Sequence, residues 1–266
     1  MNLQRYNGNW EQCIFQVNKA NKKIATSKQG IQDRISKGED SDYFQKGCWY
    51  PENFNIVNGR ILVALGDYNP LIPYAKEAVN VHKNNQELYL TDDILLNGKP
   101  ASQVLEEIAE QDKSKPVYKR RVFDMGKIQT HDISTDSFAD DKGIVFLARG
   151  EKLAQRYGKF LNDKAGIKQI RFYLSTIGNQ NYARGFWLCR LDEGGRSGFD
   201  GNDRDFDDGD GSLFGVCGSA EGTSQKISER IIQGLKLSEI LKYSEPFIAQ
   251  AVREDFKKGL RAKFKK

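Results

Sequence analysis

Residues 183–217 read ARGFWLCRLDEGGRSGFDGNDRDFDDGDGSLFGVC, the most unusual composition in the chain. Both of its ends are apolar, and its middle, residues 192–210, contains seven Asp and five Gly. Glycine costs backbone entropy in a regular element and Asp is expensive to bury, so this composition argues against a core strand or helix. Large apolar groups do not usually hold a disordered linker at both ends. We therefore expect a long ordered loop, fastened at Trp187 and Phe214, that displays its side chains on the surface.

The alternating carboxylates within this loop suggest a calcium ligand set. Asp203, Asp205 and Asp207 occupy alternate positions, as in an EF-hand loop. That motif requires Gly at its sixth position and Glu at its twelfth, where this sequence has Asp208 and Phe214. The pattern excludes an EF-hand and leaves a less regular calcium site open, beside an acidic solvated loop with no specific ligand.

The chain offers little for catalysis or for a structural metal. Two carboxylates can act as acid and base only when their surroundings separate their pKa values, and the aspartates of this loop look alike. No G-x-S-x-G, Walker or H-E-x-x-H motif occurs, and the two histidines lie far apart. We expect no enzyme, no cofactor and no bound metal. None of the four cysteines forms a CxxC pair, and a disulfide between Cys189 and Cys217, which bracket the acidic residues, stays open.

Upstream, apolar periodicity predicts a mixture of helices and strands. The segment 140–175 reads strand, helix, strand, with a strand at 144–147, a helix at 150–161 and a strand at 167–174. We also expect strands at 61–65, 87–90 and 120–125, an amphipathic helix at 101–111 capped by Ser102 or the preceding proline, and short helices at 19–30 and 31–37.

Downstream, apolar residues recur at helical spacing over 224–264, and Pro246 divides the stretch into two helices. Lys and Arg crowd the last turns, where they complement the helix dipole. This pattern predicts a helical C-terminal extension over 223–266, and a domain over 1–222 that contains the segment 183–217.

Four pieces of this segment carry a resemblance to a known group of proteins. Arg184-Gly185-Phe186-Trp187, Arg196-Ser197, Arg204 and Phe214-Gly215-Val216 resemble the closing segment of C-type-lectin-fold domains of the formylglycine-generating-enzyme type. Within that group the chain looks most like the variable proteins of diversity-generating retroelements, in which template-directed mutation of adenines diversifies small polar residues between fixed apolar ones. The family's final Arg is Cys217 here, and the variable segment usually closes the chain, whereas residues 218–266 follow.

The resemblance implies an α+β, C-type lectin-like fold whose variable segment binds diverse ligands. The enzymatic members use a cysteine-based copper site that cannot be placed on this sequence, so the resemblance implies binding and not catalysis. Trp187 and Phe214 are then structural. Aromatic residues and Arg are common hot spots, which favours Phe199, Phe206, Arg196 and Arg204. The full set of candidate contacts is Asp192, Arg196, Phe199, Asp200, Asn202, Asp203, Arg204, Asp205, Phe206, Asp207, Asp208 and Asp210.

These observations predict a ligand-binding protein whose partner is an unknown protein or surface ligand. The alternative is a virus-particle or other assembly protein that oligomerises through its helical tail. The net charge of +5 combines a basic C-terminus with an acidic loop, so we do not expect a nucleic-acid partner. The sequence has no apolar signal region and no stretch of 18 apolar residues. We therefore expect a soluble protein, cytoplasmic by default or virus-associated.

Overall fold

The computed structural model describes residues 3–41, 46–174, 180–191, 198–203 and 205–216. By its internal contacts the chain divides into two units, Met1–Cys217 and Gly218–Lys266. The second unit lies outside the described residues, so the helical extension over 223–266 stays a prediction.

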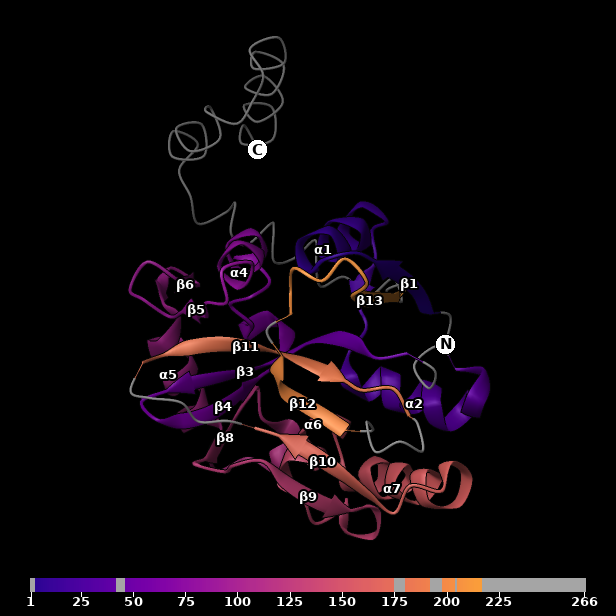
Figure 1. Ribbon diagram of the computed structural model, residues 1–266. Coiled ribbons are helices and arrows are strands. Elements are labelled where there is room, and N and C mark those ends of the chain that lie inside the picture. Colours follow the sequence, from indigo (N-terminus) through magenta and orange to yellow (C-terminus); the bar gives the residue numbers. More distant parts are fainter. Residues whose placement is uncertain (1–2, 42–45, 175–179, 192–197, 204, 217–266) are drawn as a thin grey trace, which may run out of the picture. The chain divides into compact units, whose positions relative to one another are not determined.

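The first unit is built on one large mixed sheet (Figure 1). Its central strands come from distant parts of the sequence, because β3 near the N-terminus pairs with β11 of the segment 183–217. The neighbours are antiparallel except for β10 and β12, which run parallel. In order across the sheet, the strands are β8 (Val122–Gly126), β4 (Arg60–Ala64), β3 (Cys48–Val57), β11 (Tyr182–Leu188), β12 (Gly198–Asp203), β10 (Gln169–Tyr173) and β9 (His131–Ser134), with β5 (Leu88–Tyr89) paired to β11.

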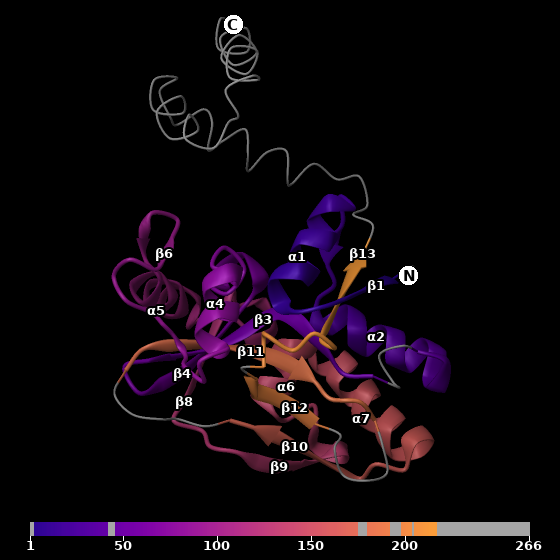
Figure 2. The ribbon, with the colours of Figure 1, turned by 45° about the horizontal axis from the view of Figure 1, so that its top comes forward.

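Helices cover both faces of this sheet and create two hydrophobic cores (Figures 1 and 2). The first core lies beneath α2 (Ser27–Lys37), α6 (Lys142–Ala148) and α7 (Glu151–Ala165). The second lies beneath α1 (Trp10–Lys19), α4 (Ala75–His82) and α5 (Ala101–Asp112). Every residue of β3 is buried because its side chains alternate between the two cores, with Trp49 in the second and Tyr50 in the first.

A smaller sheet joins the N-terminus to the end of the segment 183–217. Strand β13 (Ser212–Val216) lies between β1 (Leu3–Asn7) and β2 (Lys23–Ile24) and is antiparallel to both. Phe214 of β13 is buried in the first core. A hairpin of β6 (Leu95–Leu96) and β7 (Lys99–Pro100) precedes α5, and short 3₁₀ turns occur at Gly38–Asp40, Gly66–Tyr68, Val117–Lys119 and Thr135–Ser137.

Most of the predicted elements are confirmed. The strands expected at 61–65, 87–90, 120–125 and 167–174 are β4, β5, β8 and β10, and the helices expected at 101–111 and 150–161 are α5 and α7. Pro100 stands at the N-cap of α5 and contributes no side-chain bond, which fits the proline alternative. Gly166 ends α7 in the left-handed conformation at φ 67°, which glycine adopts without strain.

The strand predicted at 144–147 is wrong, because these residues belong to helix α6. Asp141 caps this helix by accepting a hydrogen bond from the Ile144 amide at 2.8 Å. The run from Gly143 to Ala148 is buried on every side. A helix that is buried all round loses its polar face, and a short apolar run of this kind cannot be told from a buried strand by periodicity.

The N-terminal helices begin at other residues than predicted. The sequence pattern placed helices at 19–30 and 31–37, whereas α1 ends at Lys19 and α2 starts at Ser27. Two capping boxes fix these starts, one between Asn9 and Gln12 and one between Thr26 and Gln29. In each box the cap side chain and the Gln side chain bond each other's backbone amides, which satisfies two donors at once.

Candidate functional site

The two predicted anchors of the acidic segment pack against the sheet. Phe214 is buried at 2% exposure. Trp187 is partly buried on the second core, and its ring centroid lies 5.4 Å from that of Trp49, edge to face. The segment is therefore held at both ends, as its apolar flanks predicted.

The middle of the segment contains a core strand, which corrects the prediction of a continuous loop. Strand β12 lies between β11 and β10 in the large sheet. At Gly201 a Cβ would come within 2.8 Å of the Phe54 ring, so glycine here permits close packing. Phe199 is fully buried, with its ring stacked at 5.9 Å on Phe186. Phe199 is thus a core residue, and its predicted role as an exposed hot spot is wrong.

Phe206 is the second correction. The sequence placed it among the best surface contacts, but its side chain is fully buried in the second core. The ring stacks on His82 at 4.6 Å and lies 5.2 Å from Trp10. Its carbonyl oxygen also accepts a hydrogen bond from the Trp10 amide at 2.9 Å, at the start of α1. Phe206 therefore anchors the turn that follows β12 in the middle of the acidic stretch.

Around this anchor, four carboxylates are exposed to solvent: Asp205, Asp207, Asp208 and Asp210. The turn that carries them is closed by main-chain bonds, from the Asp208 amide to the Asp205 carbonyl at 3.0 Å and from the Gly211 amide to the Asp208 carbonyl at 3.3 Å. The Asp208 carboxylate accepts from the Asp210 amide at 2.9 Å. The turn is thus an ordered platform that displays negative charge.

Asp200 lies in a less exposed environment than these four carboxylates, a difference that the sequence did not reveal. Its side chain is half-buried on β12, and this burial raises the pKa of its carboxyl group. A hydrogen bond from the Asn202 amide at 2.8 Å opposes the rise. Asp200 and Asn202 lie two residues apart on the strand and so share one face of the sheet.

Sequence reasoning missed Arg184 and Glu87 as members of this site. The Arg184 guanidinium donates to Glu87 at 2.6 Å and to the side-chain oxygen of Asn202 at 3.2 Å. It also lies 5.1 Å from the centroid of the Tyr182 ring. Arg184 was noticed only as part of the R-G-F-W motif, and nothing in the sequence brings Glu87 near it, because residue 87 lies in a different part of the chain.

The remaining predicted contacts divide into two groups. The backbone of Asp203 ends β12, and its side chain is not described. Asp192, Arg196 and Arg204 lie outside the described residues, as does Cys217, so the pairing of Cys217 with Cys189 stays open. Within the described part of the chain, no group of three or more His, Cys, Asp or Glu side chains is arranged to hold a metal ion. No helix in that part is long and apolar enough to cross a membrane.

Comparison with known proteins gives one kind of match. No protein-family model and no curated protein matches the sequence. A solved structure described as "Accommodation of massive sequence variation in Nanoarchaeota by the C-type lectin fold" superposes with a TM-score of 0.56 at 13% sequence identity. The match covers 81% of this chain and 96% of that one. The chain has a C-type lectin fold.

The turn at residues 205–210, called the acidic turn below, directly follows the half-buried pair Asp200 and Asn202 of β12. The exposed carboxylates supply acceptors and a local negative field, which attracts cationic groups of a partner. The buried aromatic residues supply rigidity and are not available for contact. The arrangement therefore suits recognition at a surface.

Proposed function

We propose that this protein binds ligands through a variable surface displayed on its C-type lectin scaffold, and that it is not an enzyme. The observation that carries the proposal is the alternation around Phe206: the ring is fully buried while Asp205, Asp207 and Asp208 beside it are exposed. A surface that must accept many sequences needs anchors that do not depend on the displayed side chains. Phe206 and Phe199 supply such anchors within the segment itself.

The proposed contacts are the predicted residues that remain after the two Phe residues are removed. They comprise Asp200, Asn202, Asp205, Asp207, Asp208 and Asp210, together with Asp192, Arg196, Asp203 and Arg204. We further propose that retroelement-directed diversification acts on this segment. Support comes from the R-G-F-W start, from the scatter of small polar residues between apolar ones, and from the similar fold of a protein described as accommodating massive sequence variation.

The proposal can be tested with a displayed library randomised at residues 205, 207, 208 and 210. We expect most clones to stay folded, as judged by resistance to protease, and panning on several unrelated proteins to enrich different sequences. Restoring the four Asp residues in an enriched clone should abolish binding. As a matched control, replacing four exposed residues of α4 and its C-cap (Lys76, Glu77, Asn80 and Lys83) should leave binding unchanged.

Two outcomes would contradict the proposal. If most library members lose protease resistance, then the exposed residues are part of the fold and cannot vary. If enriched clones keep their binding after the four Asp residues are restored, then the acidic turn is not the binding surface.

A further inference from the structure

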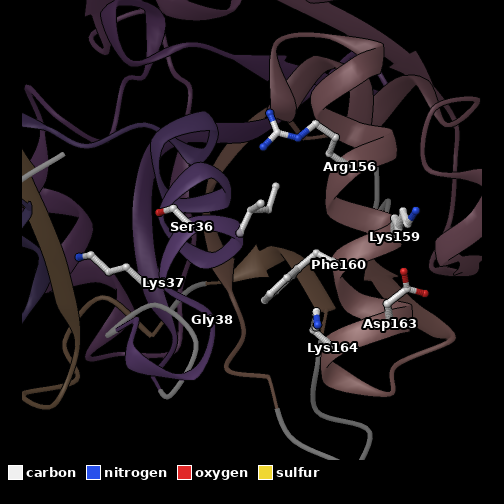
Figure 3. Close-up of a pocket in the computed structure, with 9 residues that line it drawn as sticks. Ser36, Lys37, Gly38, Arg156, Lys159, Phe160, Asp163 and Lys164 are labelled. Carbon is white, nitrogen blue, oxygen red and sulfur yellow. The ribbon is translucent and has the colours of Figure 1, made fainter.

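A groove of about 590 Å³ lies between α2 and α7, built from residues that the acidic turn does not use. Cavities of roughly 300–1,000 Å³ are typical of ligand sites. Its lining comes from the end of α2 and the C-terminal half of α7: Ile35, Ser36, Lys37, Gly38, Arg156, Lys159, Phe160, Asp163 and Lys164. Figure 3 shows Phe160 reaching from α7 toward α2.

The centre of the groove is apolar. Phe160 is 8% exposed and rests on the first core, and the half-buried Ile35 of α2 packs against the same core. A side chain that entered the groove would therefore meet a hydrocarbon surface, and burying it there would be favourable.

Two cations stand on either side of this apolar centre. Arg156 and Lys164 lie four residues before and four residues after Phe160, so all three share one face of α7. Both are exposed, and no hydrogen bond or ion pair joins either of them to another described residue. In Figure 3 they flank the ring of Phe160 at its two ends.

The other charges of the lining largely cancel. Lys37 pairs with Asp33 at 2.8 Å and points away from α7 (Figure 3). Lys159 and Asp163 lie one turn apart on α7 with opposite charges. The C-terminal ends of α2 and α7 contribute roughly half a negative charge each, which is less than the two positive charges of Arg156 and Lys164. The groove is therefore positive at both ends and apolar between.

We propose that this groove binds an extended acidic peptide segment with the pattern Glu-x-Leu-x-Glu. Arg156 and Lys164 are eight residues apart, which places their Cα atoms about 12 Å apart along the helix at roughly 1.5 Å per residue. In an extended peptide, side chains at i, i+2 and i+4 point to one face and span about 13 Å. Two Glu side chains at i and i+4 then meet the two cations, and the Leu between them meets Phe160.

The direct test uses a fluorescein-labelled peptide, Ser-Glu-Ser-Leu-Ser-Glu-Ser, and the full-length protein in fluorescence anisotropy at low salt. Replacing both Glu by Gln should weaken binding about tenfold, because it removes the charge interactions with Arg156 and Lys164. Replacing Leu by Gly should have a similar effect, because it removes the apolar contact with Phe160. A peptide with one Glu moved by a single position should also bind weakly, because its carboxylate then points to the opposite face.

Matched protein variants separate this site from the net charge of the molecule. The double variant Arg156→Glu, Lys164→Glu should bind the peptide at least tenfold more weakly. The variant Lys76→Glu, Lys83→Glu, on α4 and at its C-cap, makes the same change in net charge and should alter binding less than twofold. All four positions are exposed, so both variants should melt within a few degrees of the parent. The Arg156→Glu, Lys164→Glu protein should bind a peptide with Lys in place of both Glu residues.

The proposal would be overturned if the peptide shows no binding at millimolar concentration, if the α4 variant weakens binding as much as the groove variant, or if the charge-swapped pair fails to bind. None of these results bears on the acidic turn, so this proposal and the proposed function can fail separately.

Discussion

Replacing Phe206 by Ala should unfold the protein at a much lower temperature than replacing all four of its exposed acidic neighbours. The ring is fully buried, stacked on His82 at 4.6 Å and packed 5.2 Å from Trp10 and 6.0 Å from Trp49. Truncating a buried Phe to Ala costs about 3–5 kcal/mol, because apolar contacts are lost and a cavity remains. In a domain of this size about 1 kcal/mol shifts Tm by roughly 2–4 °C, so the expected loss is on the order of 10 °C.

The matched variant changes Asp205, Asp207, Asp208 and Asp210 together to Ser. Exposed substitutions usually change stability by less than about 0.5 kcal/mol each, and removing the repulsion among four like charges offsets part of any loss. We expect this variant to melt within about 3 °C of the parent. Thermal unfolding followed by circular dichroism measures both proteins. Phe206 is not a structural anchor if Phe206→Ala melts within 3 °C of the parent, or if the Tm of the Ser variant falls as far as that of Phe206→Ala.

Three further predictions concern residues outside the acidic turn. Burial raises the pKa of Glu52 to about 7, so the stabilisation from its protonated carboxyl group is present near pH 4 and lost as the pH rises through 7. In thermal melts, Glu52→Gln should therefore raise Tm by about 5 °C at pH 8 and leave Tm nearly unchanged at pH 5. Hydrogen bonds from Arg121 hold the pKa of the buried Asp112 well below its usual range. In urea unfolding at pH 7, Asp112→Asn should therefore lower the free energy of unfolding by about 2–4 kcal/mol. This difference should shrink below about pH 4, where the parent protein begins to lose the same stabilisation. A Cβ at Gly158 would lie 1.9 Å from the Thr135 carbonyl oxygen. Gly158→Ala should therefore lower Tm by several degrees, although Ala has the better helix propensity. An unchanged or higher Tm would show that the helix can move to admit the methyl group.

Local signals were enough to predict most of the scaffold. Helix α7 combines a clear apolar face with a glycine at its end, and β4 is a short apolar run between glycines, so both could be located from periodicity and turn residues. Helix α6 could not, because a segment buried on every side has no polar face to reveal its period. The starts of α1 and α2 are fixed by reciprocal cap bonds, which the predicted helices at 19–30 and 31–37 did not take into account.

The acidic segment was predicted correctly at its ends and wrongly in its middle. The acidic composition of residues 192–210 led us to expect Phe199 and Phe206 at the surface, whereas their rings are buried in opposite cores. Burying the ring of a single Phe is favourable enough to hold the backbone around it against the core, even where the neighbouring Asp and Gly residues are exposed to solvent. The cluster of Arg184 with Glu87 lay beyond sequence reasoning, since it depends on how β5 pairs with β11.

If diversification acts on this segment as proposed, the residues that the genetic code protects from adenine mutation should be the residues that the fold needs to keep. Phe is encoded by UUU or UUC, which contain no adenine, whereas every Asp and Asn codon contains at least one. A process that mutates template adenines would therefore leave a Phe codon of the template unchanged while it alters the codons of its neighbours. Loss of either buried ring would destabilise the scaffold, because each truncation would leave a cavity in a core.

We accordingly expect a reverse-transcriptase gene near this gene, and a near-copy of the codons for residues 183–217. Mismatches between the two copies should fall at adenines of the template, within codons 200, 202, 205, 207, 208 and 210. Codons 199 and 206 should be identical in both copies. Sequencing the flanking DNA decides the matter. Mismatches at codons 199 and 206 would show that the buried rings are themselves varied, and then the scaffold could not be independent of the residues it displays.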